Sequence, residues 1–141
     1  MVTPYSQSFS IEGSNFFKAG KASTEIRSIL KELGIDSGSI RRAAIAAFEA
    51  EMNIVMYAKR GTMTLNIAPE TIRIHVEDEG PGIENLELAM QEGYSTATPE
   101  MREMGFGAGM GLSNIKKNSD EFTISSLVGK GTKLEITITL N

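Results

Sequence analysis

Apolar residues recur at two spacings along this chain, one typical of helices and the other of strands. Within residues 14–33 and again within about 37–58 they recur every three to four positions, which predicts two consecutive helices. Asp36 or Ser37 can cap the second helix with a side-chain oxygen. The glycines expected to end the two helices are Gly34 and Gly61. The apolar residues that support these helices are Phe17, Ile26, Ile29, Leu30 and Leu33 in the first, and Ile40, Ala44, Ala47, Phe48 and Val55 in the second.

Alternation of apolar and polar residues predicts the strands. It is clearest in residues 71–77, where Ile72, Ile74 and Val76 share one face and the intervening polar residues share the other. The other predicted strands are 62–67, 121–128 and 132–140, with a short edge strand over 5–11, and short helices are predicted at about 86–91 and 110–118. In this order the elements predict an α/β (α+β) two-layer sandwich, in which helices cover one mixed or largely antiparallel sheet. The long glycine-rich stretch 93–111 has little periodicity, which is typical of a functional lid or of a disordered loop.

The composition is that of an ordinary globular protein. The chain has 141 residues, of which 40% are apolar and 23% are charged, so we expect a single domain over 1–141 with a hydrophobic core. No apolar run approaches the roughly 18 residues that cross a bilayer, and the first residues lack the features of a signal peptide. The absence of cysteine excludes disulfides, thiolate catalysis and zinc–thiolate sites. We therefore expect a cytoplasmic protein without a membrane partner.

The charge balance argues against binding to nucleic acid. The formal net charge is −4 and the sequence pI is about 5.1. Proteins that bind nucleic acid usually present a basic patch, because contacts to phosphate dominate their affinity. Here Arg41-Arg42 and Lys59-Arg60 form only short pairs, typical of solvated helix ends. No nucleic-acid partner is expected.

Glu49 and Asn53 are the first pair of residues that could carry chemistry. They are four positions apart in a predicted helix, so they lie on one face, about one turn from each other. A carboxylate can activate a hydroxyl group, and a carboxamide oxygen can complete the ligand shell of Mg²⁺. The same spacing also occurs on ordinary solvated helix faces. Glu51 lies on the other side of the helix, where we expect it to be structural or exposed.

Asp78 directly follows a predicted strand and begins the segment Asp-Glu-Gly-Pro-Gly. A carboxylate at the end of a strand can accept a hydrogen bond from the amino group of adenine. Gly80 and Gly82 would let a flat base approach the backbone closely, because glycine has no side chain. An ordinary acidic turn is the alternative interpretation.

Residues 105–111 carry a glycine at every second position. The backbone N–H groups of such a segment can converge on phosphate oxygens, and the N-terminus of the following helix adds its dipole. The segment is not the G-x-G-x-x-G motif, because Met110 and Leu112 occupy the positions of the third glycine, and the P-loop motif is absent from the chain. A flexible linker is the alternative. The segment 129–132, Gly-Lys-Gly-Thr, by itself predicts a hairpin turn.

Together and in this order, the four segments resemble the N, G1, G2 and G3 boxes of the GHKL (Bergerat-fold) ATPase and kinase superfamily. The resemblance covers about residues 36–140. Within the superfamily, the short length and the stretches EDEGPGI, EGYST and GKGT are most similar to the anti-sigma-factor serine kinases of the SpoIIAB, RsbW and RsbT type. The resemblance implies a Bergerat ATP-binding fold, with ATP and Mg²⁺ as cofactors.

The resemblance also implies a role for each matched position. Glu49 would be the general base that orients the acceptor serine hydroxyl, and Asn53 would hold Mg²⁺ against the phosphates. Asp78 would recognise adenine, with support from Thr132, and Arg102 would contact the phosphates. The other residues implied in the nucleotide site are Gly80 and Gly82 beside the base, Ser95 and Thr96 in the lid, and Gly105, Gly107, Gly109, Gly111 and Leu112 around the phosphates.

Two positions depart from the family pattern. Many relatives carry a His-Gly pair shortly after the asparagine, where this chain has Tyr57-Ala58. Arg102 is displaced by one position from the register of the lid arginine. Both departures concern catalysis more than ATP binding. The single histidine, His75, lies in a predicted strand, and we expect it to be structural.

Three functions follow from the resemblance and stay open. The first is an ATP-dependent serine/threonine protein kinase of the anti-sigma or switch type, which phosphorylates a STAS-domain antagonist and binds a sigma factor or a regulatory phosphatase. The second is a non-catalytic module in which ATP sets the affinity for a partner, and the third is a detached catalytic domain of a sensor histidine kinase. Glu49 at the position of the base favours the first. Whether the chain forms a homodimer is also open.

Overall fold

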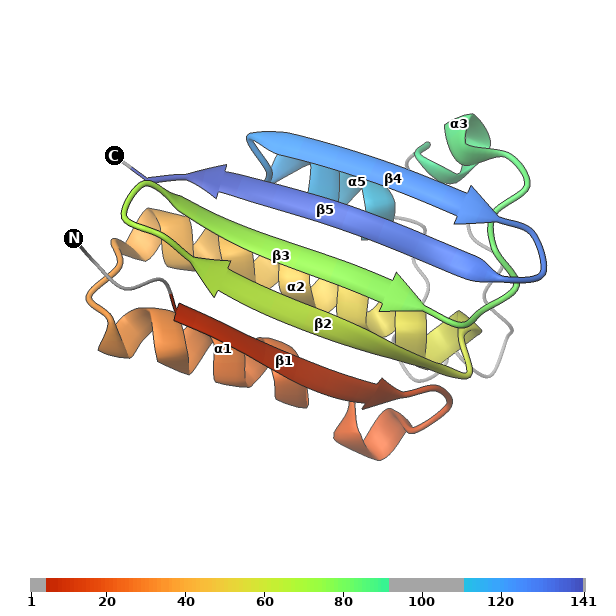
Figure 1. Ribbon diagram of the computed structural model, residues 1–141, viewed down its shortest axis with the longest axis horizontal. Helices are drawn as coiled ribbons and strands as arrows, with labels where there is room; N and C mark the ends of the chain where they lie inside the picture. Colours follow the sequence, from red (N-terminus) through yellow and green to blue (C-terminus); the bar gives the residue numbers. More distant parts are fainter. Residues whose placement is uncertain (1–4, 92–110, 141) are drawn as a thin grey trace.

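A five-stranded sheet with helices on one face forms the protein, in a computed structural model that describes residues 5–91 and 111–140 (Figure 1). The strand order is β1-β2-β3-β5-β4, and each neighbouring pair is antiparallel. The elements are β1 (Tyr5–Glu12), η1 (Phe16–Lys18), α1 (Lys21–Glu32), α2 (Ser37–Tyr57), β2 (Arg60–Ile67), β3 (Thr71–Asp78), α3 (Leu86–Ala89), α5 (Gly111–Lys117), β4 (Glu121–Leu127) and β5 (Gly131–Thr139). The predicted fold class is confirmed, and β1 is an edge strand as expected. Within the described residues, no helix is both long and apolar enough to cross a membrane.

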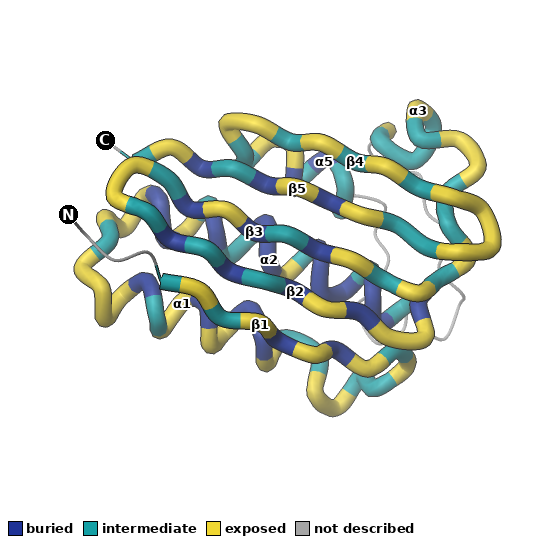
Figure 2. The backbone as a smooth tube through the Cα atoms, in the orientation of Figure 1, coloured by how far each residue is buried: buried dark blue, intermediate teal, exposed yellow. Residues whose placement is uncertain are grey.

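The hydrophobic core lies between the sheet and the helices α1, α2 and α5. Burial alternates along the central strands, so that Ile72, Ile74 and Val76 of β3 point into the core (Figure 2). In β5, Ile136 and Ile138 continue the same layer. This period of two is the pattern that predicted the strands, and it arises because successive side chains of a strand point to opposite faces.

α2 is the central helix of the covering layer and contacts both α1 and α5. Its side towards the core carries alanines that are completely buried, Ala43, Ala46, Ala47 and Ala50. Small side chains allow its neighbours to approach closely. Asp36 caps the helix, because its Oδ2 accepts a hydrogen bond from the Ser39 backbone N–H at 3.0 Å.

The start of α1 differs from the prediction. Helical spacing predicted a helix from Ser14, whereas α1 begins at Lys21 after Gly20, which has a φ of 93° and interrupts the helix. Phe17 lies in the preceding 3₁₀ turn, where its side chain is fully exposed instead of buried. Leu33 and Phe48, also expected on apolar faces, are exposed as well.

Glu51 caps the N-terminus of α1 from the neighbouring helix. Its side chain is 2% exposed, and its carboxylate accepts hydrogen bonds from the backbone N–H groups of Gly20 at 3.1 Å, Ala22 at 3.2 Å and Ser23 at 2.9 Å. The first N–H groups of a helix lack partners within the helix and attract negative charge. Glu51 is therefore structural, one of the two roles expected for it.

Gly61 was predicted to end α2 but belongs to β2. The helix ends at Tyr57, and Gly61 pairs with Ile11 of β1 and Asp78 of β3. A Cβ atom at Gly61 would lie 2.6 Å from Cδ1 of Ile54 and 2.9 Å from the carbonyl oxygen of Glu77. The glycine thus allows the last turns of α2 to pack directly against the sheet.

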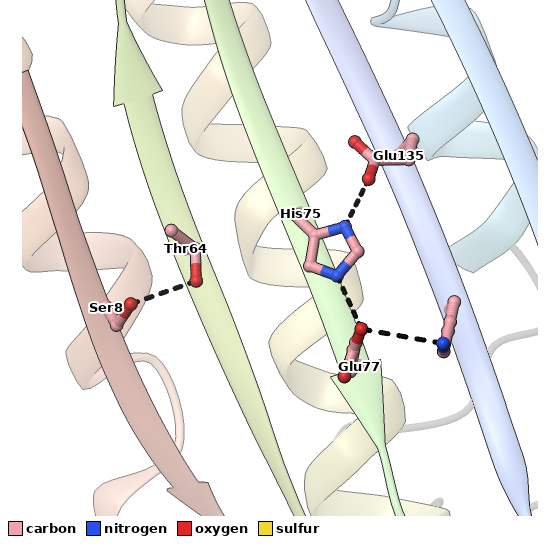
Figure 3. A network of polar contacts seen from close by, with 6 residues as sticks. Ser8, Thr64, His75, Glu77 and Glu135 are labelled. Carbon is pink, nitrogen blue, oxygen red and sulfur yellow. Dashed lines mark hydrogen bonds and ion pairs between the residues drawn. The ribbon is translucent and has the colours of Figure 1, made fainter. Parts of the chain in front are cut away.

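The face of the sheet opposite the helices carries polar side chains. His75 of β3 lies between Glu135 of β5, which contacts Nδ1, and Glu77, whose Oε1 is 2.9 Å from Nε2 (Figure 3). Ser8 and Thr64 form a hydrogen bond at 3.0 Å across β1 and β2. His75 therefore links β3 to β5 on the face of the sheet opposite the helices.

Candidate functional site

The described residues of the candidate site gather towards one end of the sheet. β3 ends there at Asp78, β5 begins there at Gly131, and the C-terminal end of α2 lies behind them (Figure 1). The carbonyl oxygen of Glu79 accepts a hydrogen bond from the N–H of Lys59 at 2.9 Å, which joins the segment after α2 to the segment after β3. Residues far apart in the sequence are therefore neighbours at this end.

The half-buried Glu49 and Asn53 lie on the side of α2 that faces α5. Asn114 of α5 donates a hydrogen bond from Nδ2 to Oε2 of Glu49 at 3.0 Å. One turn along α2, the side chain of Asn53 lies beside Gly111, the first residue of α5, where a Cβ atom would be 3.4 Å from Oδ1 of Asn53. The structure thus places the last glycine of the 105–111 segment against Asn53.

The Asp78 carboxylate is held at the end of β3 by backbone N–H groups. Thr132 donates from its backbone N–H to Oδ1 of Asp78 at 3.1 Å. Burial raises the pKa of the Asp78 carboxyl above its ordinary value, and the hydrogen bonds from the Thr132 and Gly80 backbones oppose that shift. Asp78 is thus oriented and only half-exposed, as a carboxylate that recognises a base would need to be.

Two glycines allow close backbone contacts around Asp78. Gly131 has a φ of 144°, and a Cβ atom there would lie 2.0 Å from the carbonyl oxygen of Asp78. Gly82 has a φ of 76°, and its Cβ atom would lie 2.3 Å from the carbonyl oxygen of Leu127. Any side chain at either position would collide with backbone, and an L residue rarely adopts these values of φ. Gly80 lies closer to Asp78 itself, because a Cβ atom there would be 3.0 Å from its Oδ1.

Ser126 connects the loop after Asp78 to the last hairpin. Its Oγ accepts a hydrogen bond from the N–H of Ile83 at 2.7 Å and lies 2.9 Å from Oγ1 of Thr132. The N–H of Gly129 donates to the carbonyl oxygen of Pro81 at 2.8 Å. The loop and the β4–β5 hairpin, predicted as separate turns, therefore form one cross-linked structure beside Asp78.

The remaining predicted residues divide into two groups. Leu112 is partly buried and packs against the hydrophobic core, directly after Gly111. Six predicted positions lie outside the described residues, namely Ser95, Thr96, Arg102, Gly105, Gly107 and Gly109. Within residues 5–91 and 111–140, no group of three or more His, Cys, Asp or Glu side chains could hold a metal ion.

Sequence reasoning missed Asn114, Ser126 and Gly131 as parts of this site. Asn114 follows the last glycine of the 105–111 segment by three positions, and only its contact with Glu49 distinguishes it from any polar residue of a helix. Ser126 lies in an alternating strand and carries no motif. Gly131 belongs to the predicted 129–132 segment but was given no role of its own, although its φ and its contact with Asp78 place it beside the carboxylate.

Comparisons with known proteins agree with this arrangement. The sequence matches the family described as histidine kinase-, DNA gyrase B-, and HSP90-like ATPase over residues 38–141. The serine/threonine-protein kinase RsbT of Bacillus subtilis is 32% identical over 113 residues, which cover 77% of this chain and 79% of RsbT. An anti-sigma F factor of Caldanaerobacter subterraneus subsp. tengcongensis is 38% identical over 97 residues, which cover 65% of this chain and 64% of that protein.

A second anti-sigma F factor, from Clostridium acetobutylicum, is 32% identical over 118 residues, which cover 80% of this chain and 79% of that protein. The matched family region begins at residue 38, within the first turn of α2. It therefore includes Glu49, Asn53, the end of β3 at Asp78 and the β4–β5 hairpin, where the candidate site lies. The chain therefore belongs to the histidine kinase-, DNA gyrase B-, and HSP90-like ATPase family, in the branch that includes the serine/threonine-protein kinase RsbT and the anti-sigma F factors.

Proposed function

We propose that this protein is an ATP-dependent serine/threonine protein kinase of the anti-sigma or switch type. The observation that carries the proposal is the contact between α2 and α5. It places Glu49 and Asn53, one turn apart, beside the helix that follows the glycine segment 105–111. The similarity to a protein named serine/threonine-protein kinase supports the same activity.

Glu49 would act as the general base. Its carboxylate is half-buried, and Asn114 holds one of its oxygens. A carboxylate in that position can accept the proton of a serine or threonine hydroxyl as the oxygen attacks phosphorus. When bound, Mg²⁺–ATP supplies the phosphoryl group and the positive charge that neutralises the phosphates. Asn53 would contribute a side-chain oxygen to the ligand shell of that ion.

Asp78 would select the adenine base. Its carboxylate can accept a hydrogen bond from an amino group, and the Thr132 N–H holds it in place. Gly80 and Gly131 keep side chains away from the carboxylate, so a flat ring could approach it. Specificity arises because a half-buried acceptor discriminates against a base that lacks the amino donor. Ser95, Thr96, Arg102 and the glycines of 105–111 would enclose the phosphates.

The partner that we propose as phosphoacceptor is a STAS-domain antagonist. A sigma factor or a regulatory phosphatase would be the second partner, whose activity the kinase controls. The support is the similarity to RsbT and to proteins named anti-sigma F factor. Nothing in the charge or motifs of the sequence favours a nucleic acid in either place.

A transfer assay with radiolabelled ATP, Mg²⁺ and a purified STAS-domain protein tests the proposal. We expect acid-stable phosphoserine or phosphothreonine on the STAS-domain protein. In Glu49→Gln we expect the transfer rate to fall by about a hundredfold or more, because a general base contributes on that order. ATP affinity, measured by calorimetry, should stay close to that of the wild type.

Other results would support other functions. Acid-labile label would indicate transfer to histidine. ATP-dependent binding to the STAS-domain protein without transfer would indicate a non-catalytic module. Wild-type transfer by the Glu49→Gln variant would remove Glu49 from the proposed mechanism.

A further inference from the structure

Two successive contacts join α5 to the catalytic side of α2. Gly111 lies beside Asn53, and Asn114 donates a hydrogen bond to Glu49 at 3.0 Å. Residue numbers rise from Gly111 to Asn114 along α5 but fall from Asn53 to Glu49 along α2, so the two helices run in opposite directions here. Three residues of α5 rise by about 4.5 Å and four residues of α2 by about 6 Å, so the two pairs have similar spacings. The helix that follows the glycine segment therefore touches both of the residues proposed for Mg²⁺ binding and for base catalysis.

The chemistry of the Asn114–Glu49 contact suits the orientation of a base. An ionised carboxylate offers about four lone-pair positions, and the amide of Asn114 uses one of them, on Oε2. The remaining positions can accept a hydroxyl proton. A neutral amide can orient the carboxylate without the counter-charge that a lysine or arginine would bring.

Helix formation does not explain an asparagine at this position. Asparagine is a poorer helix former than alanine, because its side chain competes for backbone hydrogen bonds. The core contact of α5 comes from Ile115, which is completely buried. The bonds that end the helix involve the Asn114 backbone, since Asn118 donates from Nδ2 to the Asn114 carbonyl oxygen at 2.8 Å. The side-chain amide points instead to Glu49.

We infer that Asn114 is a positioning residue for Glu49. It holds the carboxylate in the orientation that receives the acceptor hydroxyl, and it couples that orientation to the helix that begins at Gly111. A displacement of α5 when nucleotide binds would therefore also move the base. This inference rests on the proposed function, because it gives Asn114 a role only through Glu49.

The test compares Asn114→Ala, Asn114→Asp and a matched control, Asn118→Ala, in the transfer assay with the same STAS-domain protein. Alanine removes the donor, whereas aspartate has nearly the same shape and places a second carboxylate beside Glu49. We expect kcat to fall about tenfold in Asn114→Ala and further in Asn114→Asp. KM for ATP should stay within about twofold of the wild type. Asn118→Ala removes the neighbouring bond to the Asn114 backbone without touching Glu49, and should keep wild-type kcat.

The melting temperature distinguishes positioning from a structural role. Asn114→Ala should melt at the wild-type temperature or slightly above it, because alanine favours the helix. The inference is overturned if both Asn114 variants keep wild-type kcat, if Asn114→Asp is as active as Asn114→Ala, or if their kcat falls only together with melting temperature and ATP affinity. If the wild-type protein transferred no phosphate, the proposed function would be overturned together with the inference about Asn114. An active wild type with a fully active Glu49→Gln variant would overturn the role of Glu49 and, with it, that of Asn114.

Discussion

At the scale of single residues, Asp78 shows how the group proposed to bind adenine affects the stability of the folded protein. Its carboxylate is half-buried, and burial raises its pKa above the ordinary value despite the hydrogen bonds from Thr132 and Gly80. A raised folded pKa means that protonation of this group favours the folded state. That contribution is complete below the pKa of the unfolded chain and is lost as the pH rises through the folded pKa. At neutral pH the folded protein is therefore less stable than it would be with the Asp78 carboxyl protonated.

Asp78→Asn should consequently have opposite effects on stability and on binding. Without nucleotide at pH 7, we expect the variant to unfold at a higher urea concentration than the wild type, and this difference should disappear towards pH 4 and below. Its affinity for ATP should fall about tenfold or more, because a hydrogen bond to a charged acceptor is weakened. Urea unfolding at the two pH values and calorimetric titration with Mg²⁺–ATP measure these effects.

Glu79→Gln is a suitable control for that experiment. Glu79 is the next residue, and its exposed side chain pairs with Arg60 at 2.6 Å on the surface. Such exposed pairs contribute little to stability. If Asp78→Asn bound ATP as tightly as Glu79→Gln does, Asp78 would have no place in the nucleotide site.

At the scale of elements, Glu51 joins two helices that are separate in the sequence. It lies two residues after Glu49 on α2, yet its carboxylate is buried and accepts three backbone hydrogen bonds at the start of α1. Gly20, at the capping position of α1, has no side chain to satisfy these N–H groups. The start of α1 thus depends on a residue about thirty positions later, which is why helical periodicity alone placed it too early.

Glu51→Ala should lower the free energy of unfolding by about 2–4 kcal/mol, because it leaves several buried backbone donors without an acceptor. Glu51→Gln keeps one acceptor oxygen and should be less damaging. Urea unfolding followed by circular dichroism gives the free energies. The control is Glu49→Gln on the same helix, for which we expect a change below about 1 kcal/mol. If Glu51→Ala and Glu49→Gln lowered the free energy of unfolding equally, Glu51 would have no special role in stabilising the start of α1.

At the scale of the whole molecule, the two faces of the sheet differ. One face forms the core against α1, α2 and α5, and the other carries the polar cluster of His75, Glu77 and Glu135 (Figure 3). The hydrogen bond to Glu77 is the largest cause of a raised pKa at His75, with further contributions from Glu135, and partial burial opposes them. The same bond lowers the pKa of Glu77. The protonated histidine therefore attracts β3 to β5.

Global stability should depend on pH through this cluster. Because the folded pKa of His75 is raised, its contribution is complete below the unfolded value of about 6.5 and is lost as the pH rises through the folded pKa. We expect His75→Gln to lower the free energy of unfolding by at most about 1 kcal/mol at pH 5.5, and by much less at pH 9, because the pairs are partly exposed. Urea unfolding at both pH values measures the difference.

Ser8→Ala is the matched control on the same face, since it removes the uncharged Ser8–Thr64 hydrogen bond. Its effect on stability should be equal at pH 5.5 and pH 9. A His75→Gln effect that was likewise independent of pH would contradict an ionic role for the cluster.

Local patterns in the sequence were sufficient for the fold class and for most elements. The alternation of Ile72, Ile74 and Val76 follows directly from the geometry of a strand, and the cap at Asp36 requires only its own helix. The candidate site residues in the described part of the chain, such as Glu49, Asn53 and Asp78, were also recognisable because their spacing and order form a family pattern. The strand alternation and the helix cap depend on neighbours within a few positions, and the site residues on the order of short segments along the chain.

Tertiary structure decided the features that depend on contacts between distant segments. It brought Glu51 to the start of α1 and Asn114 to Glu49. It also placed Gly61 where α2 packs closely against the sheet. The partners of Glu51 are 28 to 31 positions away in the chain, and the partner of Glu49 is 65 positions away. Such pairs meet only after the core has brought helices and sheet together, because hydrophobic packing, and not local propensity, determines which helix faces come into contact.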